Sequence, residues 1–163
     1  DPVLFLEHKA LYRQNYAKSQ LPADEWVLPF GRAAVRRVGA DLTVITYGAL
    51  VQRALQAAET MRDEGVDVEV VDLRSLNPVD WDTCVASVEK TGKCLVMHED
   101  MRFVGYGAEI AAEIGERCFT VLDGPVRRLA SKDSPVPYNW DLEEEVLVQL
   151  DDVIAAIRDL ASF

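Results

Sequence analysis

The alternation of short apolar runs with amphipathic segments is the feature that most restricts the fold of this sequence. Residues 66–73 (VDVEVVDL) and 94–99 (CLVMHE) are short apolar runs next to turn residues, as buried strands are. Residues 49–65 and 77–92 carry apolar side chains at helical spacing, and each segment ends at or before a glycine. Strands that alternate with helices predict a mostly parallel sheet with helices on both faces, so we expect a three-layer α/β/α fold.

Further segments bring the predicted sheet to about five strands. Residues 33–39 and 40–48 indicate two strands around the short turn at Gly39-Ala40-Asp41, which favours an antiparallel hairpin and hence one antiparallel strand. Residues 107–118 are predicted as a helix, and residues 119–124 (FTVLDG) as the next strand.

The two ends of the sequence carry less regular signals. Residues 2–12 begin as a short apolar strand, whereas residues 13–31 contain two prolines and no sustained period, which is typical of a connecting segment. We therefore expect residues 1–30 to be the end of an upstream region with its linker, and residues 31–163 to be the α/β domain. The last helix is expected at about 142–161, with an apolar stripe that suits a core or a helical partner.

Composition excludes several classes of function. The net charge of −11, from 28 acidic and 17 basic residues, repels phosphate backbones and favours a basic protein partner. No apolar run reaches the length of a membrane span. The isolated Cys84, Cys94 and Cys118 indicate buried thiols of a reducing compartment. With His8 and His98 as the only histidines, no His/Cys metal cluster is expected.

A glycine-rich turn at residues 105–109 (GYGAE) lies where a strand is expected to lead into a helix, and helix N-terminal amides can hold an anion. A dinucleotide-binding fingerprint needs glycine or alanine at the sixth position, which is Ile110 here. Glu109 in the first helical turn would also oppose a phosphate. We therefore favour a flexible turn that lets helix and sheet pack closely, with an anion- or nucleotide-binding module at residues 98–110 as the alternative.

His98 is expected to end a strand at the carboxyl edge of the sheet, where open α/β sheets bind their ligands. Glu99 and Asp100 would raise the pKa of the imidazole and could orient it as an acid or base. A single histidine at a strand end is more often a hydrogen-bonded structural residue. His98 and Glu99 are thus the candidate residues of an active-site or interface edge.

Other charged groups have simpler explanations. Asp80, Asp82 and Glu143–Glu145 lie near predicted helix starts, where carboxylates favour the helix dipole, so we do not interpret them as acid/base pairs. Residues 124–137 form the one locally basic stretch, which could hold an anion or pair across an interface but by default is a solvated loop. Its basic residues are Arg127, Arg128 and Lys132.

Longer phrases of the sequence resemble one enzyme family. They are DPVLFLEHKALYR (1–13), LPFGRAAVRRVGADLTVITYGALVQRALQAAE (28–59), GVDVEVVDLRSLNPVDWDTCVASVEKTGK (65–93), HEDMRFVGYGAEIAAEI (98–114) and LDGPVRRLASKDSPVP (122–137). Together they resemble the β-subunit of thiamine-diphosphate-dependent 2-oxoacid dehydrogenases, and most of all the branched-chain (2-oxoisovalerate) type, including forms with fused α and β regions. Pyruvate and acetoin dehydrogenase β-subunits share the pattern, and transketolase C-terminal domains share the fold.

The resemblance implies that this chain and the rest of the enzyme have different roles. Residues 1–30 would be the end of a pyrimidine-binding domain with its linker, and residues 31–163 a transketolase-type C-terminal domain that is inactive alone. Thiamine diphosphate and its divalent metal (Mg²⁺) would bind mainly outside this chain, and the cofactor would carry the decarboxylation. Implied partners are an α-subunit or α-region, a second β-subunit and the basic subunit-binding domain of a lipoyl acyltransferase core. The implied location is the bacterial cytoplasm or, in a eukaryote, the mitochondrial matrix.

Overall fold

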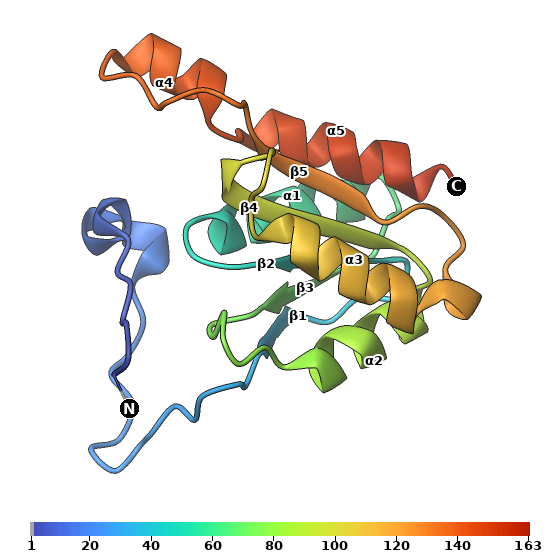
Figure 1. Cartoon of the computed structure of the whole chain (residues 1–163), viewed down its shortest axis with the longest axis horizontal. Coiled ribbons are helices and arrows are strands. Elements are labelled where there is room, and N and C mark those ends of the chain that lie inside the picture. The colour runs from blue at the N-terminus through green and yellow to red at the C-terminus, as the bar shows by residue number, and fades with distance from the viewer. Residues whose placement is uncertain (1) are drawn as a thin grey trace.

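The computed structural model describes residues 2–163 and has a five-stranded sheet at its centre, in the order β1-β3-β2-β4-β5 (Figure 1). The strands are β1 (Ala34–Arg37), β2 (Leu42–Thr46), β3 (Val68–Asp72), β4 (Cys94–Met101) and β5 (Arg127–Ser131). Strand β2 is parallel to β3 and β4, β4 is parallel to β5, and β1 is antiparallel to β3. The predicted mostly parallel sheet with one antiparallel strand is confirmed.

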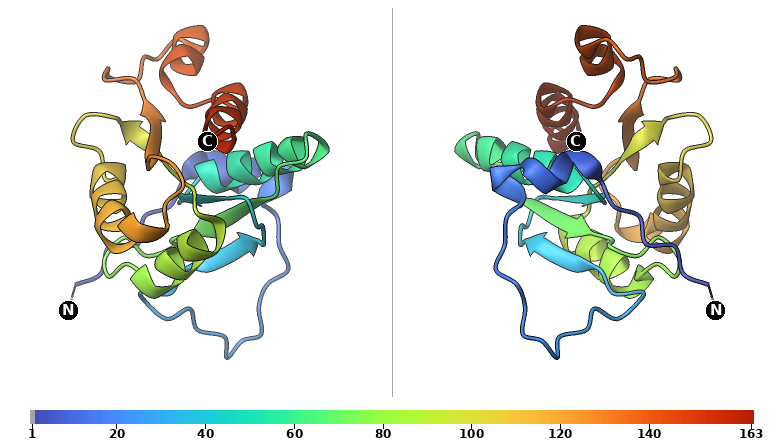
Figure 2. Two further views of the ribbon diagram at one scale, coloured as in Figure 1. Left: turned by 90° about the vertical axis from the view of Figure 1, so that its right-hand side faces the viewer. Right: turned by 90° about the vertical axis from the view of Figure 1, so that its left-hand side faces the viewer.

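Helices cover both faces of this sheet (Figures 1 and 2). The α-helices are α1 (Leu50–Asp63), α2 (Trp81–Thr91), α3 (Gly107–Arg117), α4 (Trp140–Val146) and α5 (Leu150–Ala161). Three short 3₁₀ helices are η1 (Lys9–Arg13), η2 (Asn15–Ala17) and η3 (Phe119–Val121). Helices α1 and α5 share one hydrophobic core with the sheet, and α2 and α3 share the other. The three-layer α/β/α prediction is therefore confirmed.

Strand β2 shows why its sequence is apolar throughout. Successive side chains of a strand point to opposite faces, so Val44 packs into the core under α1 and α5 while Ile45 packs into the core under α2 and α3. All five residues of β2 are buried. A strand covered on both faces has no solvent side on which to place polar residues, and this explains the continuous apolar run.

Two helix ends follow local signals in the sequence. Helix α2 begins after Asp80, whose Oδ1 accepts a hydrogen bond from the Thr83 amide at 3.2 Å, and it ends at Gly92 with a φ of 69°. Asp80 is thus a capping residue, as its position near a helix start predicted.

The predicted hairpin between residues 33–39 and 40–48 is wrong, because β3 lies between β1 and β2 in the sheet. The connecting turn is attached to the start of β3, where the amides of Ala40 and Asp41 both donate to the Asp67 carbonyl, at 3.0 and 2.9 Å. A Cβ atom at Gly39 would lie 2.3 Å from the Glu69 amide nitrogen. This close approach of two backbones directs β1 to the outer side of β3.

The strand predicted at residues 119–124 is also wrong, since residues 119–121 form η3 and the edge strand β5 starts at Arg127. Pro125 has no amide hydrogen to donate to a strand ladder. The register is instead set by β4, which aligns Leu95 with Arg127 and His98 with Ala130.

The single last helix predicted at about 142–161 is in fact two helices, α4 and α5. Gln149 has extended backbone angles and starts α5 with a capping box, in which the Asp152 carboxylate accepts from the Gln149 amide at 2.8 Å. Figure 1 shows α4 projecting beyond the sheet, while α5 lies along it. The apolar stripe of α5 belongs to the core, through Val153, Ile157 and Leu160.

The N-terminal segment, residues 2–30, lies beside the end of the sheet from which β4 leads into α3 (Figures 1 and 2). The strand predicted to begin in residues 2–12 is wrong, because residues 2–8 form no regular element and residues 9–13 form η1. Leu4, Phe5 and Leu6 are 90%, 83% and 80% exposed. No helix within residues 2–163 has the length and apolar character needed to cross a membrane.

Candidate functional site at the carboxyl edge of the sheet

His98 lies inside strand β4 and is completely buried. It does not end the strand as predicted, because β4 continues to Met101 after a register shift. The His98 Nε2 atom lies 3.2 Å from the Met101 carbonyl oxygen, while Nδ1 is buried and has no hydrogen-bond partner within residues 2–163. A neutral ring that donates from Nε2 fits this environment.

Burial lowers the pKa of His98 below its usual value near 6.5, and the nearby Arg128 and Arg102 act in the same direction. The Met101 carbonyl and the Asp100 carboxylate favour the charged form but do not offset burial. The prediction that neighbouring carboxylates raise this pKa is therefore wrong in its net direction. His98 is set up as a neutral structural group.

The two glycines of the GYG turn make room for the His98 ring. A Cβ atom at Gly105 would lie 2.2 Å from His98 Nε2, and one at Gly107 would lie 2.3 Å from His98 Nδ1. These distances are far below van der Waals contact, so only glycine allows the start of α3 to lie against the imidazole. The interpretation of these glycines as packing residues agrees with the geometry.

The same turn offers little room for a phosphate. The Ala108 amide donates to the Gly105 carbonyl at 2.9 Å, and the Glu109 amide donates to the Tyr106 carbonyl at 3.1 Å. Amides that cradle a phosphate must point at the ligand instead. Because His98 fills the space beside the glycines, the geometry does not favour the anion- or nucleotide-binding alternative at residues 98–110.

Glu99 faces the N-terminal segment, away from His98. Its carboxylate oxygens lie 3.2 and 3.1 Å from His8 Nε2, although the two residues are 91 positions apart in the chain. Both side chains are about one-third exposed, at 35% and 34%. Sequence reasoning placed Glu99 at an edge but had no signal for its pairing with His8.

Two tyrosines line the carboxyl edge next to this contact. The rings of Tyr47, after β2, and Tyr106, before α3, pack edge to face with centroids 6.2 Å apart, and the Tyr106 hydroxyl donates to the Leu76 carbonyl. Burial, together with the Asp100 carboxylate, raises the pKa of Tyr47 to about 12. The edge therefore presents neutral phenols, which can donate hydrogen bonds but are not ionised nucleophiles near neutral pH.

The basic residues predicted as one stretch are divided among different contacts. Arg127 pairs with Asp159 of α5 at 3.2 Å, and Lys132 pairs with Glu145 of α4 at 3.1 Å. Arg128 instead reaches along the edge of the sheet to the Arg102 backbone. These three basic residues therefore make separate contacts and do not form one anion-binding site.

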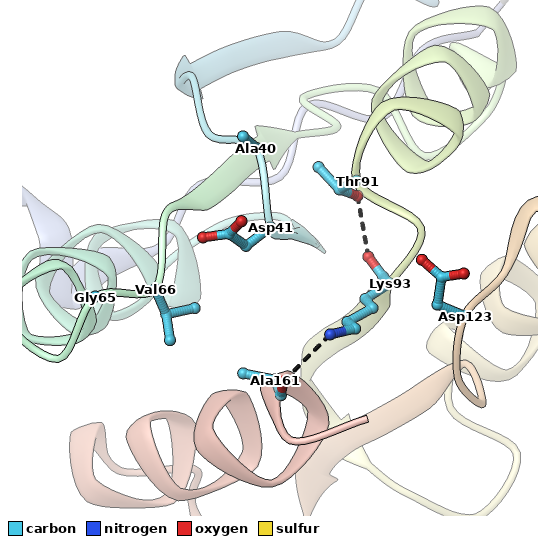
Figure 3. A pocket seen from close by; sticks show the side chains of 8 residues that line it. All are labelled: Ala40, Asp41, Gly65, Val66, Thr91, Lys93, Asp123 and Ala161. Atoms are coloured by element: carbon cyan, nitrogen blue, oxygen red, sulfur yellow. Dashed lines mark hydrogen bonds between the residues drawn. The ribbon is translucent and has the colours of Figure 1, made fainter.

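An open pocket of about 390 Å³ lies at the opposite, amino-terminal edge of the sheet, with Asp41, Lys93 and Asp123 among its lining residues (Figure 3). The Lys93 ammonium donates to the Ala161 carbonyl at the end of α5, at 3.2 Å, where a cation favours the helix dipole. Ligands of open α/β sheets bind at the carboxyl ends of the strands. We therefore assign Lys93 a structural role.

A diphosphate with its metal ion would need clustered metal ligands and amides that are free to point at the phosphates. Residues 2–163 contain no group of three or more His, Cys, Asp or Glu side chains placed to hold a metal ion. The turn that most resembles a phosphate cradle is filled by His98. Residues 2–163 therefore do not fit a diphosphate with its metal.

The three cysteines are buried in the core under α2 and α3, as predicted. Burial raises the pKa of the Cys84 thiol to about 12 and raises that of Cys118 as well. Their thiolates are suppressed near neutral pH, so they act as small apolar side chains and not as nucleophiles.

The order of the strands and the helices on both faces define an open, three-layer α/β domain. The family model for the transketolase C-terminal domain matches residues 31–153. The chain belongs to this family.

Curated relatives extend the comparison over the whole sequence. The chain is 47% identical over 164 aligned residues to the 2-oxoisovalerate dehydrogenase subunit beta of Bacillus subtilis, covering 100% of this chain and 50% of that protein. It is 46% identical to the pyruvate dehydrogenase E1 component subunit beta of Staphylococcus epidermidis, covering 85% of this chain and 42% of that protein. The chain thus spans about half the length of the curated relatives it matches.

A solved structure supports the same fold. The split-gene transketolase, described as an inactive beta4 tetramer, superposes with a TM-score of 0.70 at 25% identity, over 88% of this chain and 46% of that one. The resemblance of the sequence to dehydrogenase β-subunits and to the transketolase C-terminal fold is therefore confirmed.

Proposed function

We propose that this chain is the C-terminal assembly and docking domain of the dehydrogenase component of a 2-oxoacid dehydrogenase complex, with a branched-chain 2-oxoacid as its substrate. The observation that carries the proposal is the 47% identity to a 2-oxoisovalerate dehydrogenase β-subunit across the entire chain, including residues 2–30. An equivalent place in a pyruvate dehydrogenase is the second candidate, favoured by the 46% identity to that β-subunit.

The N-terminal segment supports a role within a larger assembly. None of residues 2–30 is buried, and among them Leu4, Phe5 and Leu21 are at least 80% exposed. A run of exposed large apolar side chains marks a surface that is covered by protein. We infer that residues 1–30 are the end of a pyrimidine-binding domain with its linker, and that Glu99 is the point at which the domain formed by residues 31–163 contacts this segment.

In this assignment the chain alone is inactive. Thiamine diphosphate with Mg²⁺ would supply the decarboxylation chemistry in the intact enzyme and would be bound mainly outside the described residues. The α-subunit or α-region and a second β-subunit would complete the oligomer. The enzyme would lie in the cytoplasm of a bacterium or in the mitochondrial matrix of a eukaryote.

Charge supports docking to a basic acyltransferase domain. The net charge of −11 attracts a basic partner. Helix α4 extends beyond the sheet with Asp141 and Glu144 exposed on it (Figure 1). These carboxylates make no ion pair within the described residues, so they are available to a partner.

Binding of the purified chain to the subunit-binding domain of the lipoyl acyltransferase tests this proposal. We expect affinity that falls steeply with salt, and a weaker complex for the variant D141N/E144Q. The matched control is E89Q/E116Q, which removes two exposed carboxylates from α2 and α3 and should leave the affinity unchanged. Absence of binding, or binding without salt dependence, would contradict the docking function.

A further inference from the structure

Two arginines at the outer edge of the sheet hold each other in place without a carboxylate. Arg102 follows β4 and donates from its Nη1 atom to the Arg128 carbonyl at 2.6 Å, while Arg128 of β5 donates from its Nη1 atom to the Arg102 carbonyl at 3.2 Å. The Arg102 amide also donates to the Ser131 carbonyl at 3.1 Å. Both guanidinium groups are thus oriented by backbone atoms.

Neither of these guanidiniums forms an ion pair within residues 2–163, although the chain has 28 acidic residues. Asp100 accepts the Met101 amide at 2.7 Å and Asp133 accepts the Phe103 amide at 2.7 Å, and neither carboxylate forms an ion pair with these arginines. The arginines that do form ion pairs are Arg36, Arg37, Arg62, Arg117, Arg127 and Arg158. Arg102 and Arg128 are among the six arginines that form none within the described residues, and they lie side by side because each donates to the backbone carbonyl of the other.

Each arginine keeps donors for a ligand. A guanidinium has five N–H donors, and each of these side chains uses an Nη1 atom for its backbone contact, so Nη2 and Nε stay free within the described residues. Such forks match the two oxygens of a carboxylate. Backbone anchoring has already fixed the side chains, so less conformational freedom is lost when a carboxylate binds.

The surface beside the pair is apolar. Phe103 is 77% exposed and Val104 is 82% exposed, and Val104 has a φ of 59°, a conformation that β-branched residues rarely adopt. Arginine next to an exposed aromatic side chain is typical of the residues that dominate protein interfaces. The net charge of −11 disfavours a nucleic acid, and the apolar rim favours a protein over a free inorganic anion.

We propose that Arg102 and Arg128 form a carboxylate-binding site that receives an acidic side chain of a protein partner, with an apolar neighbour of that side chain packed on Phe103. The carboxylate specificity stands on the geometry of this chain alone. The identity of the partner as another subunit or region of the 2-oxoacid dehydrogenase rests on the proposed function.

Titration of the free chain tests the site. Sodium acetate and sodium phenylacetate would be added at constant ionic strength, with the Nε–H signals of the arginines followed by NMR. We expect saturable shifts at Arg102 and Arg128, about threefold stronger binding of phenylacetate because its ring packs on Phe103, and only a weak linear response at Arg62. The same weak response at all three arginines would overturn the proposal.

Association with the α-subunit or α-region of the dehydrogenase tests the partner. The variant R102Q/R128Q should bind at least about tenfold more weakly, and R102K/R128K should recover only part of the affinity because lysine lacks the fork. The control R36Q/R62Q should bind like the unmodified chain. Equal affinities for R102Q/R128Q and the unmodified chain would overturn the assigned partner, whereas failure of the unmodified chain to associate would contradict the proposed function and leave the titration to decide the site.

Discussion

His8 contacts Glu99 and so attaches the N-terminal segment to the carboxyl edge of the sheet, with 3.1 Å between His8 Nε2 and Glu99 Oε2. The segment around His8 has little other packing, because no residue between 2 and 30 is buried. A single partly exposed polar contact of this kind is worth about 0–1 kcal/mol. The segment is therefore attached weakly, and contacts with a neighbouring domain would strengthen the attachment.

Removal of this contact should release the segment. For Glu99→Gln we expect trypsin to cleave after Lys9, Arg13 or Lys18 about two- to fivefold faster, as loss of a weak surface contact predicts. Glu7→Gln is the matched control, because Glu7 contacts only Tyr12 within the same segment. Equal cleavage rates for the two variants would show that Glu99 does not hold the segment.

The glycines beside His98 give a prediction for stability. Gly105→Ala and Gly107→Ala should each lower the free energy of unfolding by about 1–3 kcal/mol, because the new methyl group overlaps the imidazole. Gly115→Ala in the same helix α3 meets no atom within 4 Å and should instead stabilise the chain by about 0.5–1 kcal/mol. Urea denaturation measures all three.

The overlap with the ring can be separated from other effects. In a His98→Ala background, Gly107→Ala should cost less than it does in the unmodified chain, because the atoms that it meets have been removed. An unchanged cost in that background would mean that backbone conformation, and not the His98 ring, requires the glycine.

Burial of His98 predicts the direction of a pH effect. Because the pKa of His98 is lowered from 6.5 in the folded chain, the unfolded chain binds more protons just below that pH. The free energy of unfolding should therefore fall as the pH drops below about 6.5. Above that pH His98 should make no pH-dependent contribution to it. His98→Asn should reduce this slope. An equal slope in His98→Asn would contradict the assignment.

The buried carboxylate of Glu69 makes a further stability prediction. Glu69 is 2% exposed and accepts hydrogen bonds from Ser87 and Lys90 of α2 and from the Gly39 amide at 3.2 Å. Glu69→Ala removes this acceptor from the buried Ser87 hydroxyl and Gly39 amide and should cost about 1–3 kcal/mol of unfolding free energy. Glu116→Ala on the exposed side of α3 should stay within about 0.5 kcal/mol of the unmodified chain. A change this small for Glu69→Ala would show that water replaces the carboxylate.

Local sequence was enough to locate most helices and the parallel strands. Asp80 and Gly92 bound α2 through side-chain capping and a left-handed backbone, which depend only on neighbouring residues. The wrong predictions concern which strands pair and where they lie. Strand β1 pairs with β3 and not with β2, and β5 lies several residues beyond its predicted place. Strand pairing depends on which backbone edge is free elsewhere in the sheet, and the residues of one strand do not encode that.

The candidate site, like the fold, was predictable from the sequence only in part. The position of His98 near a carboxyl edge followed from the sequence, whereas its complete burial, its lowered pKa and its fit against Gly105 and Gly107 did not. The apolar run around it could describe a strand end or a strand interior equally well. Only the packing of α3 on β4 decided that this imidazole is a structural group.

The sequence by itself determined the alternation of strands and helices, the helix caps and the buried thiols, because periodicity, capping and hydrophobicity act over a few neighbouring residues. The tertiary structure alone decided the strand order, the contact of His8 with Glu99 across 91 positions and the mutual hold of Arg102 and Arg128. These relationships join residues that are distant in the chain, and they arise only when the core brings the strand ends together.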